Sequence, residues 1–322
     1  MLFRQIIAWL LVPCAFFANV LGFGADASKD TEEDYLNRLN GIEIYENTQQ
    51  TAVPMTEVYN IIKKHLTSPL PEGKTEKKVL VLGYDGCRAD SMYLLDQSKK
   101  SSVKTLLSDG GKAYIAYCGG VNFPAVNTQH TSTAPGWCSM LTGQWADVHG
   151  ITENGQPKSN EHLTCLTTFV KDGLVDNSAF YVSWDGHFKE ENATYTNEVN
   201  FVKENGINTL FSDSAGDVGT FNNVMRDIKR QDCTDFIFSI LEFCDHSGHA
   251  LGFDYNNLTY KRAFFDADLA GYKLIKAVKN RKTYDSEDWL FIITSDHGGY
   301  AKGHGGPTLQ ERMMFIITNK EI

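Results

Sequence analysis

Acidic and imidazole side chains follow three apolar stretches of the sequence at the same relative position. "DGCRAD" follows "KVLVLGY", "CDHSGH" follows "DFIFSILEF", and "DHGG" and "KGHGG" follow "WLFIITS". Ionised Asp and neutral His are the ligand types that suit zinc and similar divalent ions. The pattern therefore indicates a metal centre, with the candidate ligands Asp85, Asp245, His249, Asp296, His297 and His304.

Each of these residues also has an ordinary structural explanation. A single Asp after a strand is often a helix cap or a turn former, and a single His is often a surface residue. Turns alone do not explain why several apolar runs all end in such groups. The adjacent glycines in Gly248-His249, His297-Gly298 and His304-Gly305 favour the metal interpretation, because glycine lets the backbone approach a crowded site.

A group of hydroxyl residues offers a candidate nucleophile. "TSTAPGWCSMLTGQWADVHG" runs from Thr131 to Gly150. Pro135 is suited to the first turn of a helix that covers "PGWCSMLTG". A hydroxyl just before that helix would lie where free backbone amides and the helix dipole favour a phosphoryl oxygen or an alkoxide. The same hydroxyl could equally be no more than an N-cap.

The elements that must position these groups alternate along the chain. Continuous apolar, β-rich runs occur at 78–84, 113–118, 178–183, 235–243, 289–295 and 313–318. Segments with helical periodicity lie at 56–66, 162–173, 220–230 and 260–280. Such alternation predicts an α/β fold with a mostly parallel central sheet sandwiched by helices. Ligands of such folds bind beyond the carboxyl ends of the strands, which is where the candidate residues lie.

The N-terminal part of the chain differs in character from the rest. Arg4, an apolar run and the small residues "ADA" predict a signal peptide over residues 1–27, which we prefer to a membrane anchor because the run is short and contains Pro13. Residues 28–77 are expected to form an N-terminal arm and linker, and residues 78–322 the catalytic domain. The formal net charge of −10 argues against binding of a nucleic-acid duplex.

Export would place the cysteines in an oxidising compartment. Six cysteines remain after residue 27, and we therefore expect some disulfides without being able to assign the pairs: Cys87, Cys118, Cys138, Cys165, Cys233 and Cys244. The sequons at Asn192 and Asn257 would be glycosylated only in a eukaryotic secretory pathway.

Together these motifs resemble those of the alkaline phosphatase superfamily, in particular of its type I phosphodiesterase/nucleotide pyrophosphatase family. That family has Asp-Gly-Phe-Arg-Ala-Asp/Glu after a strand, and this chain has "DGCRAD". The family continues with Thr-x-Pro, Thr-Gly and His-Gly-Ile, matched here by "TAP", "LTG" and "HGI". Its closing motifs are matched by "DHSGH", "SDHGG" and "GHGG", so that the resemblance covers residues 78 to about 317.

The resemblance implies a role for each matching residue. Thr133 becomes the nucleophile, with Ser132 and Thr131 as fallback candidates. Asp85, Thr133, Asp296 and His297 would hold one divalent ion, and Asp245, His249 and His304 the other, with zinc as the expected metal. Thr133 would attack phosphorus to form a covalent phospho-threonine, which activated water then releases.

The chain departs from the family next to the nucleophile. Ala134 and Gly136 stand where the family has Phe and Asn, so that an aromatic platform and a side-chain donor are missing, and the backbone amide of Ala134 is expected to compensate for the donor. Candidate replacements for the platform are Trp137, Trp145, Tyr84, Trp184 and Tyr300. We expect a structural or pocket-lining role for His187, a solvent-facing salt bridge for Arg88, and a substrate contact at most for Lys302.

Several functions fit this sequence. The first is a secreted phosphodiesterase or nucleotide pyrophosphatase acting on a small phosphate ester. A phosphomonoesterase or a phospho-head-group transferase is the nearest alternative, and a sulfatase is less favoured because Trp137 stands where sulfatases have Arg. A catalytically inactive binding protein is the alternative of a different class. Membrane association is expected only if the N-terminal segment is retained, and the oligomeric state stays open.

Overall fold

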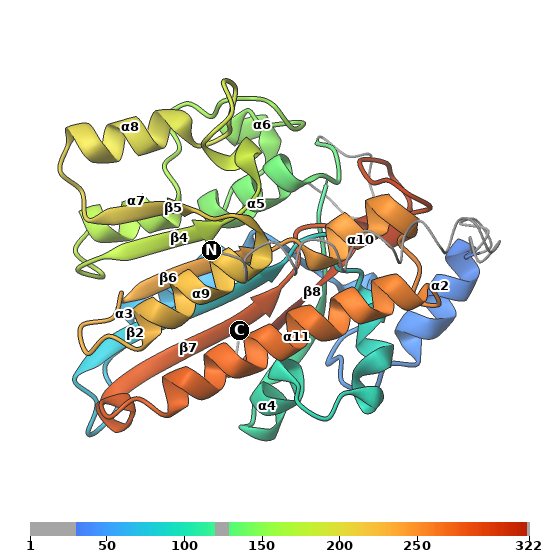
Figure 1. Cartoon of the computed structure of the whole chain (residues 1–322), viewed down its shortest axis with the longest axis horizontal. Coiled ribbons are helices and arrows are strands. Elements are labelled where there is room, and N and C mark those ends of the chain that lie inside the picture. The colour runs from blue at the N-terminus through green and yellow to red at the C-terminus, as the bar shows by residue number, and fades with distance from the viewer. Residues whose placement is uncertain (1–29, 120–128, 321–322) are drawn as a thin grey trace, which may run out of the picture.

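One central sheet contains all six apolar runs as strands. The computed structural model describes residues 30–119 and 129–320 (Figure 1). Within them, the sheet has the order β1-β3-β8-β7-β2-β6-β4-β5. The strands are β1 (Val53–Pro54), β2 (Glu76–Tyr84), β3 (Lys112–Tyr117), β4 (Ser178–Val182), β5 (Thr209–Asp213), β6 (Phe236–Leu241), β7 (Glu287–Thr294) and β8 (Met313–Thr318).

The sheet is mostly parallel, as the sequence predicts. Strand β2 lies at its centre and pairs in parallel with β6 and β7; Val81, for example, lies opposite Phe238 and Ile292. Strand β8 runs antiparallel to both of its neighbours, β3 and β7. The edge strands β1 and β5 were missed, because β1 has only two residues and β5 is only partly buried.

Side chains of the central strands point alternately into two separate cores. Leu80 and Leu82 pack on one face of the sheet, and Val79 and Val81 on the other. Helices cover both faces, which gives the three-layer sandwich predicted from the sequence. The helices are α2 (Glu32–Asn40), α3 (Glu57–Thr67), α4 (Ser102–Ser108), α5 (Thr133–Thr142), α6 (Ala146–His149), α7 (Cys165–Lys171), α8 (Thr196–Glu204), α9 (Gly216–Ile228), α10 (Phe243–Leu251), α11 (Leu258–Lys279) and α12 (Leu309–Arg312).

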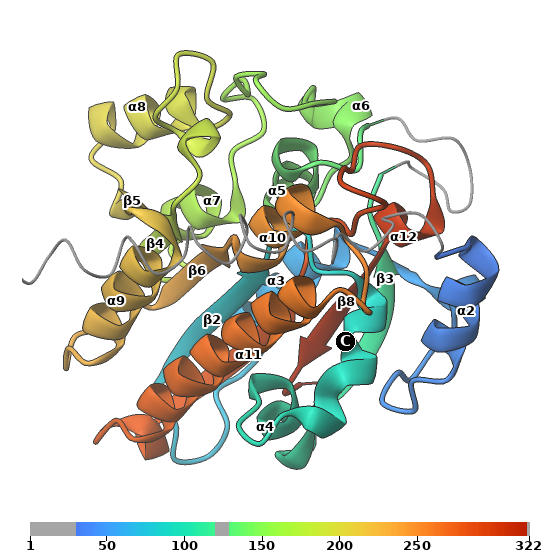
Figure 2. The same ribbon diagram turned by 45° about the vertical axis from the view of Figure 1, so that its right-hand side comes forward.

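The two helical layers have different members. Helices α2, α4, α9 and α11 contribute to the core on the Leu80 side, and α3, α5 and α7 to the core on the Val79 side. Figure 2 shows α11 and α4 in front of β2 and β8. The helical periodicities at 56–66, 162–173, 220–230 and 260–280 correspond to α3, α7, α9 and α11, so these predictions are confirmed.

The segment before β2 contributes to both layers and to the sheet. Strand β1 pairs in parallel with β3, whereas α2 and α3 pack on opposite faces. The expected signal peptide over residues 1–27 lies outside the described residues. No helix in the described ranges is long and apolar enough to span a membrane.

The expectation of disulfides is not met in the described ranges. All six cysteines there are free and buried, and they are distributed over three apolar clusters. Cys138 packs with Ala134 and Ile151, for example, whereas Cys118 and Cys165 belong to the core on the Val79 side. The thiols fill small positions within these clusters, a common role for buried cysteine.

Candidate active site

Three strands deliver the predicted ligands to one edge of the sheet. Asp85 directly follows β2, and Asp296 follows β7. Strand β6 leads into α10, on which Asp245 and His249 are four residues apart and share one face. His304 comes from the loop between β7 and β8. The carboxyl ends of parallel strands thus bring together residues that are far apart in the sequence.

The first cluster consists of Asp85, Asp296 and His297, which are fully buried. Nε2 of His297 lies 3.5 Å from Oδ1 of Asp85 and 3.4 Å from Oδ2 of Asp296. One ligand atom from each residue lies within 4.8 Å of the others, so a single ion can be shared.

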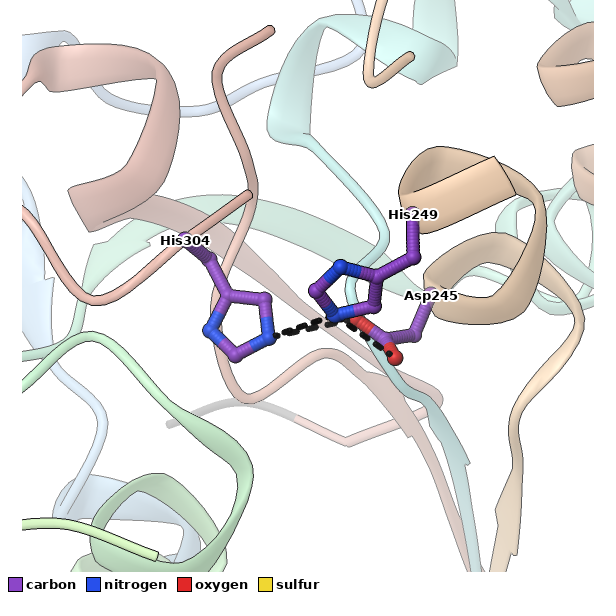
Figure 3. A group of neighbouring side chains, drawn as sticks. All are labelled: Asp245, His249 and His304. Atoms are coloured by element: carbon purple, nitrogen blue, oxygen red, sulfur yellow. Dashed lines mark hydrogen bonds and ion pairs between the residues drawn. The ribbon is translucent and has the colours of Figure 1, made fainter. Parts of the chain in front are cut away.

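The second cluster consists of Asp245, His249 and His304 (Figure 3). Nε2 of His249 lies 3.0 Å from Nε2 of His304 and 3.5 Å from Oδ2 of Asp245. Oδ1 of Asp245 is 3.5 Å from Nε2 of His304. The two clusters adjoin, because the rings of His297 and His304 stack with their centroids 4.0 Å apart.

All three histidines are oriented in the same way. Nδ1 of His297, His249 and His304 faces the backbone carbonyl of Gly298 (2.7 Å), Lys302 (3.1 Å) and Thr131 (3.0 Å), respectively. A neutral imidazole that donates from Nδ1 keeps the lone pair on Nε2. Each Nε2 faces a cluster, and this is the arrangement of metal-binding histidines.

The carboxylates complete the donor set. Oδ1 of Asp85, Oδ2 of Asp296 and Oδ1 of Asp245 are buried and have no hydrogen-bond donor in the described part of the chain. Buried oxygens of this kind are costly unless a cation satisfies them. The residues therefore fit two divalent ions.

The carboxylates of the two clusters repel one another. Burial raises the pKa of Asp85 and of Asp296 well above the usual value, and repulsion between carboxylates adds to this. Burial likewise raises the pKa of Asp245 to about 6 and lowers that of His304 to about 4. A bound cation would relieve this repulsion and reverse the local preference.

Of the three hydroxyl candidates, Thr133 contacts a residue of the first cluster. It is the first residue of α5, and its Oγ1 lies 3.5 Å from Nε2 of His297. The hydroxyl of Thr131 instead donates to the carbonyl of Gly306 and accepts the N–H of Gly305. Thr131 thus holds the loop that carries His304.

Two residues near the site were not singled out from the sequence. Oδ1 of Asn154 accepts the N–H of Ala134 at 2.9 Å, so that amide is not free, contrary to expectation. Glu242 is buried beside Asp85 and Asp245 and presents a third carboxylate. Glu242 carries a signal in the sequence because it is a carboxylate inside the apolar run 235–243, whereas Asn154 lies in a polar loop and carries none.

Arg88 differs from its expected role. Its side chain is completely buried and pairs with Asp30 and Asp90, so the salt bridge is not solvent-facing. The sequence could not show this, because α2 and the loop after β2 come together only in the fold. His187 is buried among Phe180, Trp184 and Tyr195 and does not belong to either cluster.

Most of the aromatic candidates lie in the core. Tyr84 and Trp137 are fully buried, and Trp145 stacks on Tyr117. Trp184 is only partly buried and packs against the small cluster that contains Ala134, next to Thr133. Tyr300 is also partly exposed.

These features define a protein of the alkaline phosphatase superfamily, with an α/β sandwich and paired Asp/His clusters at the ends of its strands. The chain belongs to the type I phosphodiesterase/nucleotide pyrophosphatase family, whose model matches residues 79–301. The resemblance drawn from the motifs is thereby confirmed. No curated protein matches the chain significantly.

Several solved structures are similar to this chain at low sequence identity. Murine ectonucleotide pyrophosphatase/phosphodiesterase 5, an inactive variant in complex with AMP, is 20% identical with a TM-score of 0.46; the match covers 69% of this chain and 57% of that one. This chain therefore spans little more than half the length of that protein.

The periplasmic domain of phosphoethanolamine transferase EptC from Campylobacter jejuni is 15% identical with a TM-score of 0.50, covering 77% of this chain and 81% of that one. BT1596, a 2-O glycosaminoglycan sulfatase, is 11% identical with a TM-score of 0.50, covering 76% and 66%. At such identities the likeness extends to the fold and not to the substrate.

Proposed function

We propose that this protein is a two-metal hydrolase that cleaves phosphodiester or nucleotide pyrophosphate bonds, with Thr133 as the nucleophile. The observation that carries the proposal is the common orientation of His249, His297 and His304, whose Nε2 atoms all face the clusters. Fixing three imidazoles in this way next to unpartnered carboxylate oxygens has an evident purpose only if cations bind there.

The clusters define which residues would hold each ion. Asp85, Asp296, His297 and the hydroxyl of Thr133 would bind one ion, and Asp245, His249 and His304 the other. Mixed Asp and His ligands favour zinc. When bound, the two ions would lower the pKa of the hydroxyl, neutralise phosphate oxygens and activate water.

In the proposed reaction, Thr133 attacks phosphorus. Its Oγ forms a bond to phosphorus while the bond to the leaving-group oxygen breaks, and that oxygen takes up a proton. In a second displacement, water forms a new bond to phosphorus as the bond to Oγ breaks, and the hydroxyl is restored. The position at the start of α5 favours the negative charge that develops at both stages.

Asn154 and Trp184 would recognise the substrate. Because Oδ1 of Asn154 accepts the N–H of Ala134, the amide –NH2 group remains available to donate to a phosphoryl oxygen. Trp184 packs beside Ala134, where it could stack on an aromatic leaving group or a nucleobase. Together they would replace the donor and the platform that Gly136 and Ala134 cannot supply.

We further propose that the protein is secreted after removal of residues 1–27, with 28–77 as an arm on the catalytic domain 78–322. The two sequons differ in their suitability for a glycan. Asn192 is exposed, whereas Asn257 donates its amide hydrogens to the carbonyls of Leu251 and Gly252. A glycan on Asn257 would displace one of these bonds, so Asn192 is the expected acceptor.

The direct test compares hydrolysis of bis-p-nitrophenyl phosphate and p-nitrophenyl phosphate by the zinc-loaded protein at alkaline pH. We expect a preference for the diester that is lost in Thr133→Ala and kept in the control Ser132→Ala, the neighbouring hydroxyl. A preference for the monoester would instead indicate a phosphatase. Zinc binding without activity on either compound would argue for a binding protein or a narrow substrate.

A further inference from the structure

Arg88 is a fully buried arginine that belongs to neither metal cluster. Its Nε and Nη2 donate to the two carboxylate oxygens of Asp90 at 2.9 and 2.8 Å, a bidentate pair. Nη2 also donates to Oδ2 of Asp30 at 2.5 Å, and Nη1 donates to the carbonyl of Phe253 at 2.6 Å. The guanidinium is thus bound on three sides.

These contacts reach the three segments that carry the Asp and His ligands, although not α5, which carries Thr133. Arg88 itself lies three residues after Asp85. Phe253 follows α10, and its ring packs edge-on against His249 with the centroids 5.5 Å apart. Gly298, the residue after His297, also lies close to Arg88, since a Cβ added to this glycine would lie 3.1 Å from Cγ of Arg88. A substitution of Arg88 would therefore be expected to shift ligands in both metal clusters.

The N-terminal arm closes the same cluster of charges. Nη2 of Arg38, on α2, donates to Asp30 at 2.5 Å and to Asp90 at 2.9 Å. Each of the two arginines thus contacts both aspartates, and the two positive charges balance the two negative charges. The ring of Tyr35, also on α2, lies 4.9 Å from the Arg88 guanidinium.

We propose that the four-charge cluster of Asp30, Arg38, Arg88 and Asp90 positions the ligands of both metal sites. The geometry of these sites would then depend on how α2 packs against the rest of the fold. Arg88 is the central positioning residue of the cluster. The inference rests on the proposed function only in treating the two clusters as metal sites. A buried ion network gives little net stability compared with apolar packing, so its geometric effect is the better explanation.

The test measures zinc affinity in variants at each end of the network. Loss of residues that orient metal ligands costs about 10- to 100-fold in metal affinity. We expect losses in this range for Arg88→Met and about 10-fold for Asp30→Asn, which keeps the shape of the side chain. Arg88→Lys should not restore affinity, because lysine cannot make the bidentate contact to Asp90.

The matched control is Glu198→Gln, which removes one charge of another fully buried pair, Lys158 and Glu198. Glu198 also bonds with Thr164 and Thr167 and does not contact the ligands. We expect this control to unfold at a lower temperature but to keep its zinc affinity. The difference separates positioning from a general loss of stability.

Hydrogen exchange on the metal-free protein gives a second readout. Asp30→Asn should speed exchange in 85–90, 245–253 and 296–304 but not in α7. Wild-type zinc affinity and exchange in both Asp30→Asn and Arg88→Met would overturn the inference. If Arg88→Met does not fold, Asp30→Asn decides alone. If the wild-type protein binds no zinc, the proposed function fails, while the exchange data still decide whether the network positions these loops.

Discussion

The indole Nε1–H of Trp137 donates a hydrogen bond to Oδ2 of Asp85 over 2.7 Å. Trp137 lies one helical turn after Thr133, so α5 carries both the proposed nucleophile and a group that fixes a ligand of the same cluster. The bond occupies one carboxylate oxygen and leaves Oδ1 facing His297. The ring itself is buried and meets Phe238 edge-on.

Trp137→Phe should weaken zinc binding at the cluster of Asp85 by about 10-fold, because the orientation of the carboxylate is lost while most of the packing remains. A competition titration with a chelator measures this. The matched control is Trp145→Phe, since Trp145 stacks on Tyr117 instead of contacting a ligand. Equal zinc affinity in the two variants would contradict the role assigned to Trp137.

Gly136→Ala should lower diester hydrolysis by more than about 10-fold and destabilise the protein by about 1–3 kcal/mol, the usual cost of overpacking. A Cβ at this position would lie 3.0 Å from both Cβ and the backbone oxygen of Asp296. A Cβ at Gly303 would meet open space, so Gly303→Ala serves as the control. Unchanged activity in Gly136→Ala would show that Asp296 can move without consequence.

The central strands, and the clustering of the candidate ligands at one edge of the sheet, could be predicted from the sequence for one physical reason. Parallel strands covered on both faces read as continuous apolar runs, and such sheets place their sites at the carboxyl ends of the strands. Strand β5 was not predicted, because it lies at an edge, is half-buried and does not form a continuous apolar run.

Contacts between distant segments could not be predicted. Tertiary packing alone produces the hydrogen bond from Trp137 to Asp85 and the one from the N–H of Ala134 to Asn154. It also buries Arg88. Polar residues in loops are usually exposed, so the default expectation for Arg88 was wrong. The cysteines were judged by cellular compartment, which does not say which thiols meet in the fold; Cys87 and Cys244, for example, are hydrogen-bonded to each other, and both are free.

Asn154→Ala should reduce kcat for the diester by about 100-fold, the usual effect of losing one donor to a developing oxyanion, and leave zinc affinity unchanged. Asn154→Asp is the sharper variant, because it can still accept the N–H of Ala134 but has no amide to donate. We expect both variants to be equally slow. If Asn154→Asp keeps wild-type kcat, the residue acts only as a cap.

His187 should make the metal-free protein sensitive to acid. Burial lowers the pKa of His187 from 6.5 to about 3, so its neutral form stabilises the fold above about pH 6.5, and this contribution is lost as the pH falls towards 3. Between pH 7 and pH 5 the loss amounts to about 2 kcal/mol.

His187→Phe removes the titrating group while keeping an aromatic ring among Phe180, Trp184 and Tyr195. Urea unfolding at pH 7 and pH 5 should therefore show an acid-induced loss that is about 2 kcal/mol smaller in the variant. Other buried histidines still contribute in both proteins, among them His65 and His149, because burial lowers the pKa of each to about 4. An equal loss in both proteins would contradict the assignment.

The stereochemistry of the reaction shows whether Thr133 forms a covalent bond to phosphorus, as we propose. The measurement is the configuration of the product when the zinc-loaded protein hydrolyses a chiral p-nitrophenyl phosphorothioate diester in water enriched in heavy oxygen. Each in-line displacement inverts phosphorus, so two displacements through Thr133 predict net retention, and Thr133→Ala should be inactive. Net inversion would mean that water attacks directly, and it would contradict the role of Thr133.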